Sequence, residues 1–305
     1  QQKQRASITQ RVSDSVVDSR NMCLLFLKFK QNAAKEEYSL ILVSVRDEYY
    51  ERPTKLAMRW KESEIIGAHS LKMTAQDMET NREGGTWIAV NTESGKIAVL
   101  LNILQRDAEL NKRPRGLLVP DYLKNDASPQ NHLENIAQIA DKYNGFVLVC
   151  IQMNPSNLFE VCFFSNGYYD KPQALSPGVY AFGNSFNPDH PWPKVSYGKD
   201  RFEEVIDRHK TVHTKDALIA DLFDMLSDRT QVELDEQMLK QGSDKTLFYM
   251  QRLNSLYVEI PEKKYGTRTW TIILIDGNKN GDFIERTMKE PIDCDGTKNI
   301  RKVFI

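Results

Sequence analysis

Cys23-Leu24-Leu25-Phe26-Leu27 and Tyr38-Ser39-Leu40-Ile41-Leu42-Val43-Ser44-Val45 are the two apolar runs that decide the fold, and the second leads directly into Arg46-Asp47-Glu48. Runs of this length, bounded by polar segments, predict buried β-strands. Paired strands lie roughly 5 Å apart. A thiol at the head of one strand can therefore meet the charged cluster at the end of the next, and we expect Cys23 and Arg46 to share a site.

Met22 stands directly before Cys23, which suggests a second use for the thiol. A chain that began at Cys23 would carry a free α-amine with a pKa near ~8, able to take the thiol's proton. This is the chemistry of N-terminal-nucleophile hydrolases. Residues 1–21 precede Met22, so the amine exists only if they are removed. Because they lack the apolar core of a signal peptide, we predict a flexible extension at 1–21, with a mitochondrial presequence as the weaker alternative.

Composition narrows the class of protein. With 305 residues, of which 40% are hydrophobic, the chain can bury a sizeable core. The net charge of −1 gives no electrostatic argument for nucleic acid or an anionic membrane as partner. No apolar run approaches the ~18 residues of a membrane span. Four cysteines and the lack of a glycosylation sequon favour a reducing compartment. Cys150 and Cys162 flank a turn signal, and we interpret them as buried thiols that face each other across a hairpin.

Short turns between apolar runs predict antiparallel hairpins, and amphipathic helices between the strand groups predict covering layers. We see no linker that would divide residues 22–305, so a single domain is expected. The predicted strands are 23–29, 38–45, 87–91, 96–102, 145–153, 158–164, 179–182, 256–260, 270–276 and 282–287. The predicted helices are 112–125, a segment from the Ser128 cap to Asn144-Gly145, 199–210, and one beginning at the Thr214 cap.

Several residues are candidates for chemistry beside Cys23 and Arg46. Asp47 could orient an amine, and Glu48 completes the charged cluster. Asn102, at a predicted strand end, could donate its amide to an oxyanion, although an Asn there is more often a turn residue. Arg268 is a second candidate clamp for an anion, with a surface ion pair as the alternative. His69 lies between the charged cluster and Gly84-Gly85-Thr86-Trp87, so we expect it near the site.

The sequence contains no pattern that clearly predicts a metal site. The five histidines do not pair with cysteines or carboxylates at zinc spacing. The segment Asp276–Gly281 resembles the start of a calcium loop, but the twelfth position is Thr287 rather than Glu. We therefore predict a plain hairpin turn there, no metal site, and no covalently bound cofactor.

Taken together, segments across residues 22–290 resemble the NRDE protein family, in its transport and Golgi organisation protein 2 branch. The stretches that carry the resemblance are Met22-Cys23-Leu24-Leu25-Phe26, Arg46-Asp47-Glu48-Tyr49 with Arg52-Pro53, Gly84-Gly85-Thr86-Trp87, Leu101-Asn102, Arg115-Gly116, Tyr143-Asn144-Gly145-Phe146, Ser176-Pro177-Gly178-Val179-Tyr180, Pro191-Trp192-Pro193-Lys194-Val195, and Tyr265-Gly266-Thr267-Arg268-Thr269 with Glu285-Arg286. Worm members of this branch, which are associated with haem movement, look closest.

The resemblance implies an α+β fold of four αββα layers, similar to N-terminal-nucleophile hydrolases, with two stacked antiparallel sheets. It also implies a cytoplasmic protein linked to haem trafficking, Golgi organisation, mitochondria, and lipid or acyl-coenzyme A handling. This sequence departs at two points. Val45 replaces the Asn of the family's name, and residues 1–21 block a free amine on Cys23. Both departures count against amidohydrolase chemistry.

Two functions follow as hypotheses. The first is a carrier that binds haem as cargo, or an acyl-coenzyme A or lipid, through Arg46, Asp47, Glu48, Arg268 and His69, because arginine pairs well with carboxylates and phosphates. Transient membrane contact is part of this hypothesis. The second is a cysteine amidohydrolase in which Cys23 attacks, Arg46 and Asp47 tune it, and Asn102 or Asn184 holds the oxyanion. The oligomeric state is open.

Overall fold

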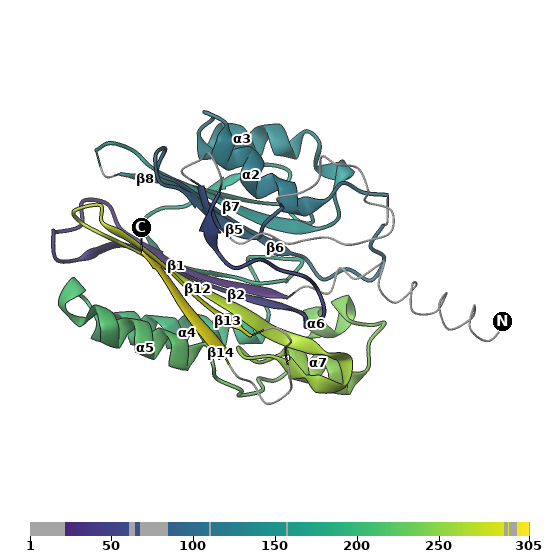
Figure 1. Cartoon of the computed structure of the whole chain (residues 1–305). Coiled ribbons are helices and arrows are strands. Elements are labelled where there is room, and N and C mark those ends of the chain that lie inside the picture. The colour runs from purple at the N-terminus through teal and green to yellow at the C-terminus, as the bar shows by residue number, and fades with distance from the viewer. Residues whose placement is uncertain are drawn as a thin grey trace.

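Two antiparallel sheets, each of seven strands, form the centre of the computed structural model (Figure 1). The structure describes residues 22–60, 65–67, 85–109, 111–156, 158–289, 292 and 298–304. The predicted extension at 1–21 and His69 lie outside these residues. No helix in the described ranges is both long enough and apolar enough to cross a bilayer.

Sheet A has the strand order β10-β1-β2-β12-β13-β14, with β11 paired to β12. Its strands are β1 (Cys23–Phe29), β2 (Tyr38–Tyr49), β10 (Gly178–Phe182), β11 (Glu259–Ile260), β12 (Tyr265–Asp276), β13 (Gly281–Met288) and β14 (Lys298–Phe304). Sheet B runs in chain order through β3 (Met58–Arg59), β4 (Ile65–Gly67), β5 (Ile88–Asn91), β6 (Lys96–Asn102), β7 (Phe146–Met153), β8 (Phe159–Ser165) and β9 (Gln173–Ala174).

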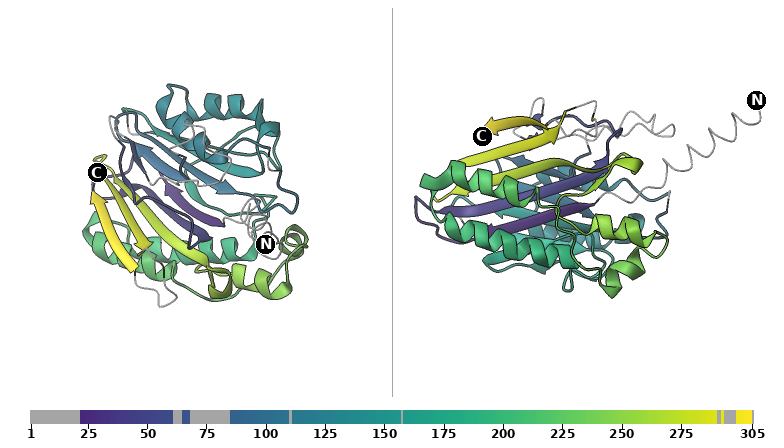
Figure 2. Two further views of the ribbon diagram at one scale, coloured as in Figure 1. Left: turned by 45° about the vertical axis from the view of Figure 1, so that its right-hand side comes forward. Right: turned by 90° about the horizontal axis from the view of Figure 1, so that it is seen from below.

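Helices cover the outer face of each sheet (Figures 1 and 2). On sheet B lie α2 (Leu118–Lys124) and α3 (Pro129–Ala137), with the short 3-10 turns η1 (Arg115–Leu117) and η2 (Ala140–Lys142). On sheet A lie α4 (Pro193–Arg208) and α5 (Lys215–Met225), together with α6 (Glu236–Gln241), α7 (Leu247–Leu253), η3 (Val212–Thr214) and η4 (Pro261–Lys263). The expectation of a mixed α+β fold with antiparallel sheets is confirmed.

Alternation along the strands separates three apolar clusters, because successive side chains of a strand point to opposite faces. In β1, Leu25 belongs to the cluster between the sheets, whereas Leu24 and Phe26 belong to the cluster under α4 and α5. In β6, Val99 faces the inner cluster and Leu100 the cluster under α2 and α3. Both sheets are thus apolar on both faces, which explains why their strands read as continuous apolar runs.

The structure corrects several predicted boundaries. The helix predicted at 112–125 covers only Leu118–Lys124, and the strand predicted at 270–276 begins at Tyr265. β2 extends to Tyr49, so the charged cluster lies within the strand and not beyond it. The helix predicted at 199–210 begins at Pro193, since proline suits the first helical turn. The predicted strand at 256–260 keeps only its last two residues, and Thr214 makes no side-chain cap to α5. The cap by Ser128 is confirmed, but α3 ends at Ala137, before Asn144-Gly145.

The hairpin predicted around the two cysteines is confirmed. Cys150 on β7 pairs directly with Cys162 on β8. Both thiols are buried and free, on the face of sheet B that α3 covers. Their role in the described structure is packing.

Candidate functional site

Cys23 and Arg46 are direct cross-strand partners in the pairing of β1 with β2. Side chains of such a pair stand on the same face of a sheet, about 4.5–5.5 Å apart at their Cβ atoms. Cys23 belongs to the inner cluster, so both side chains point between the two sheets. Only 4% of Cys23 and 3% of Arg46 is exposed, which makes this a buried site.

The triplet Arg46-Asp47-Glu48 is divided between the two faces of sheet A because it forms part of β2. Arg46 and Glu48 face inward and form an ion pair of 3.0 Å between Nη2 and Oε2. Asp47 points the other way, toward the helices, where its Oδ1 accepts a hydrogen bond of 2.6 Å from the Thr267 hydroxyl. The expectation of one joint binding cluster therefore needs revision, since only the outer two members of the triplet share the space with Cys23.

Aromatic and polar contacts hold the Arg46 guanidinium in place. Its Cζ lies 4.2 Å from the centre of the Trp87 ring, a cation–π arrangement. Its Nη1 donates to the Thr54 hydroxyl over 3.2 Å. Burial lowers the pKa of Arg46 to about 10, so that the group remains charged at neutral pH.

Three further arginines gather around this position. Arg52 shares the Glu48 carboxylate, with 2.5 Å between Nη1 and Oε2. Arg268 donates from Nη1 to the carbonyl oxygens of Tyr49 (2.9 Å) and Arg52 (2.6 Å). Arg115 donates to the Gly145 carbonyl oxygen over 2.6 Å, and burial, with repulsion from Arg52, lowers its pKa to about 10. We call Arg46, Arg52, Arg115 and Arg268 the arginine cluster.

Gly85 and Gly116 allow two backbone segments to approach closely beside Arg115. A Cβ on Gly85 would lie 3.3 Å from the Gly116 carbonyl carbon, and the Thr86 amide donates to the Gly116 carbonyl oxygen over 2.9 Å. This close backbone approach fixes the segment after Arg115 against the start of β5. Arg115 lies near enough to Cys23 for the charge of the thiolate form to raise the pKa of Arg115, against the larger lowering by burial and Arg52.

The backbone on both sides of the Cys23 α-carbon is held by buried side chains. The Cys23 amide donates to Asn184 Oδ1 over 3.1 Å, and the Met22 amide donates to the Tyr265 hydroxyl over 3.0 Å. Asn184 in turn donates from Nδ2 to the carbonyl oxygen of Asn102 over 2.6 Å. Asn102 thus contributes its backbone, and the amide group of Asn184 is already engaged.

Burial sets the protonation of the thiol. It raises the pKa of Cys23 to about 12, with Asp47 adding to the rise and Arg46 opposing it. The thiol therefore keeps its proton at neutral pH, although the thiolate is the nucleophilic form. A cysteine nucleophile needs a lowered pKa or an adjacent base, and neither is present in the described residues while Cys23 N is part of a peptide bond.

Asp47 meets a buried lysine on the helix side of sheet A. Lys194, in the first turn of α4, is fully buried and donates to the Leu253 carbonyl oxygen over 2.8 Å. Burial lowers the pKa of Lys194 and raises that of Asp47 to about 6, each shift being opposed by the charge of the other group. Asp47 Oδ2 has no hydrogen-bond partner within the described structure.

Sequence reasoning assigned no role to Lys194 or Arg115, although both fall in stretches that carried the family resemblance. A signal existed for Lys194. It stands four residues before Gly198 and eight before Phe202, on the apolar face of its helix, and a lysine in such a position must be buried. For Arg115 no pattern existed, because the approach of a 3-10 turn to strands distant in the sequence leaves no periodicity. The structure describes no group of three or more potential metal-ligating side chains within its ranges.

The fold and site define a two-sheet α+β protein with a buried cysteine beside an arginine cluster. The chain belongs to the family described as Transport and Golgi organisation 2, whose profile matches residues 22–290. It is 35% identical over 272 residues to the human Transport and Golgi organization protein 2 homolog, covering 88% of this chain and 94% of that protein. It is 30% identical over 273 residues to the Drosophila melanogaster Transport and Golgi organization protein 2, covering 88% and 92% respectively.

Proposed function

We propose that this chain is a carrier for an amphipathic anionic ligand, bound at the Cys23 end of sheet A. Haem is the first candidate cargo, and an acyl-coenzyme A or acidic lipid is the alternative within the same chemical class. The names of the relatives speak of transport and Golgi organisation, which fits a role in trafficking. The four layers of helices and sheets support a kinship of the scaffold with N-terminal-nucleophile hydrolases.

The arginine cluster is the observation that supports this function. Within the described residues, the ion pairs of Arg46 and Arg52 both go to the single carboxylate of Glu48, and Arg115 donates only to a neutral carbonyl. Among Glu48, Arg46, Arg52 and Arg115, positive charge therefore exceeds negative charge. Guanidinium groups bind carboxylates and phosphates through paired hydrogen bonds. The propionates of haem and the phosphates of coenzyme A are such groups.

The protonated thiol favours binding over catalysis. A hydrolase would need the Cys23 thiolate, and the pKa of about 12 opposes its formation. One contact keeps the hydrolase as the second candidate. Asn184 Oδ1 accepts the Cys23 amide, and would accept an α-amine in the same position.

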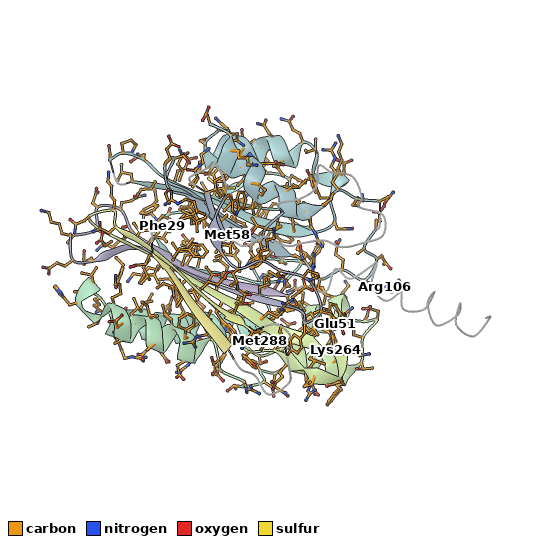
Figure 3. The ribbon with its side chains drawn as sticks, viewed as in Figure 1. Phe29, Glu51, Met58, Arg106, Lys264 and Met288 are labelled. Atoms are coloured by element: carbon orange, nitrogen blue, oxygen red, sulfur yellow. The ribbon has the colours of Figure 1, made fainter. Side chains whose placement is uncertain are left out.

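Titration with haemin and with palmitoyl-coenzyme A tests the carrier. We expect Arg52→Gln and Arg115→Gln each to weaken binding about tenfold, the size of one lost hydrogen bond between charged groups. Arg106→Gln is the matched control. Its side chain is 63% exposed, it pairs with Asp107, and it lies at the same end of the molecule as Glu51 and Lys264 (Figure 3). Equal affinity of all three variants and the wild type would overturn the carrier.

A chain that begins at Cys23 tests the hydrolase. Turnover of acyl amides by that chain, lost in Cys23→Ser, would establish the second candidate. Ligand binding that survives Cys23→Ser and fails in Arg115→Gln would establish the first.

A further inference from the structure

A cleft of about 420 Å³ opens at the other end of sheet A, on the face that carries the helices. Its walls come from the start of β2, the β12–β13 hairpin and the turn that leads into α5. The residues that line it are Tyr38, Val212, Lys215, Leu274, Asp276, Asn280, Gly281 and Asp282. A volume of this size lies within the range of small-ligand pockets. Tyr38 and Arg46 stand eight residues apart on β2, so this cleft and the Cys23 site are separated by roughly 26 Å at about 3.3 Å per residue.

Tyr38 is the unexplained residue of the cleft. Only 5% of it is exposed, and its hydroxyl has no hydrogen-bond partner among the described side chains and backbone groups. Buried polar groups are normally paired, so an unpaired one calls for a physical reason. A register shift between Ile275 and Asp276 leaves Ser39 as an extra residue in β2 just beyond Tyr38. Bulges of this kind redirect the neighbouring side chain.

Carboxylates dominate the charge of the cleft. Asp276 and Asp282 line the cleft together with Tyr38. Burial raises the pKa of Tyr38 to about 12, and the charges of Asp282, Asp276 and Asp216 add to the rise. Asp282 pairs with Lys215, whose Nζ lies 2.9 and 3.3 Å from its two oxygens. Among the described side chains that line the cleft, Lys215 is the one cation.

The other lining carboxylate has no ion pair with a described cation. Asp276 accepts hydrogen bonds at Oδ1 from the amides of Asn278 and Asn280 and at Oδ2 from the Asn280 side chain. These neutral donors hold the hairpin turn and leave the negative charge in place. Over its described lining residues the cleft therefore carries a net negative charge, with apolar wall from Val212 and Leu274 and the unpaired hydroxyl of the buried Tyr38 beside it.

We propose that this cleft binds an organic cation, an ammonium group on an alkyl chain. The ammonium group would donate to the Tyr38 hydroxyl oxygen and lie among the carboxylates of Asp276 and Asp282, while the alkyl chain packs on Val212 and Leu274. An ammonium group has three donors and no acceptor, which matches an acceptor-rich pocket. The cation reaches the cleft either as a free alkylamine or as a lysine side chain of another polypeptide.

Nuclear magnetic resonance of the full chain, labelled with ¹⁵N, tests the proposal. The probes are n-pentylamine, the neutral n-pentanol, and a capped Gly-Lys-Gly peptide. We expect pentylamine to shift the backbone amides of Gly281, Asp282 and Lys215, and pentanol to leave them unchanged. Tighter binding of the peptide would identify a lysine side chain as the natural group, and tighter binding of pentylamine a free amine.

Substitutions at the cleft residues test which side chains bind pentylamine. Tyr38→Phe removes only the hydroxyl and keeps the ring in the core, and we expect about tenfold weaker binding of pentylamine. Asp282→Asn should weaken binding by a similar factor, whereas Asp244→Asn, an exposed carboxylate elsewhere in the chain, should have no effect. Unchanged affinity in both cleft variants, equal shifts with pentanol, or no shifts with either amine would overturn the proposal.

Discussion

Asp47 shows how one residue position determines a local environment. It lies between two inward-facing charged residues, and strand alternation alone sends its carboxylate into the layer under α4. Burial there raises the pKa of Asp47 from 3.8 to about 6, although Lys194 and the Thr267 hydroxyl oppose the rise. The folded chain therefore holds this proton more tightly than the unfolded chain does.

This shift predicts a pH dependence of folding. A carboxyl group with a raised pKa in the folded state contributes stability that is complete below pH 3.8 and is lost as the pH rises toward 6. Asp47→Asn cannot titrate. We expect the free energy of unfolding of Asp47→Asn, measured in urea relative to that of the wild type, to rise by about 2 kcal/mol between pH 4 and pH 6. Asp244→Asn serves as an exposed control. If the difference in unfolding free energy between Asp47→Asn and the wild type stays constant over this range, the pKa of Asp47 is the same in the folded and unfolded chains.

At the scale of elements, α4 packs on β1 through one glycine. A Cβ at Gly198 would lie 2.4 Å from Phe26 Cζ and 2.8 Å from Leu256 Cδ2. The bare backbone therefore allows the helix to approach the strand that begins with Cys23. The same helix brings Lys194 to Asp47, so this contact also sets the charge environment of the site.

Gly198→Ala tests that contact. Alanine favours a helix by about 1 kcal/mol over glycine, but the added methyl group would force the Phe26 ring or the helix to move, at a cost of typically 1–3 kcal/mol. Because the clash is this close, we expect the cost to exceed the gain and the melting temperature to fall. Ser196→Ala, on the exposed side of the same helix, should change stability little. A stabilised Gly198→Ala chain would contradict the packing described here.

For the molecule as a whole, the two sites lie at opposite ends of sheet A. Sites this far apart, without shared partners, normally respond to substitution independently. We expect Asp282→Asn to bind haemin or palmitoyl-coenzyme A with wild-type affinity within twofold, and Arg52→Gln to bind pentylamine likewise. The double variant should show the sum of the single effects on both affinities. A fivefold or larger cross-effect would instead reveal coupling along β2.

Much of the candidate site could be predicted from sequence, because the residues that matter lie on two adjacent strands. The apolar runs around Leu25 and Leu42 predicted the strands, and the short connection between the two runs favours their pairing. That pairing alone brings Cys23 to Arg46, as the register confirms. Asn184, which sequence reasoning placed at the oxyanion, does reach Cys23, but it contacts the backbone amide and not a free group.

The sequence by itself determined the strands, the hairpins and the pairing of Cys23 with Arg46, because these depend on local periodicity and on neighbouring segments. Only the tertiary structure decided that Asp47 lies within the electrostatic reach of Lys194, that Arg115 approaches the site from η1 beside sheet B, and that Tyr38 lines a cleft with Asp282. These contacts join residues separated by long stretches of chain, and they depend on strand ends, a bulge and the packing of layers. No local pattern encodes such distances, so they arise only when the sheets and helices are assembled.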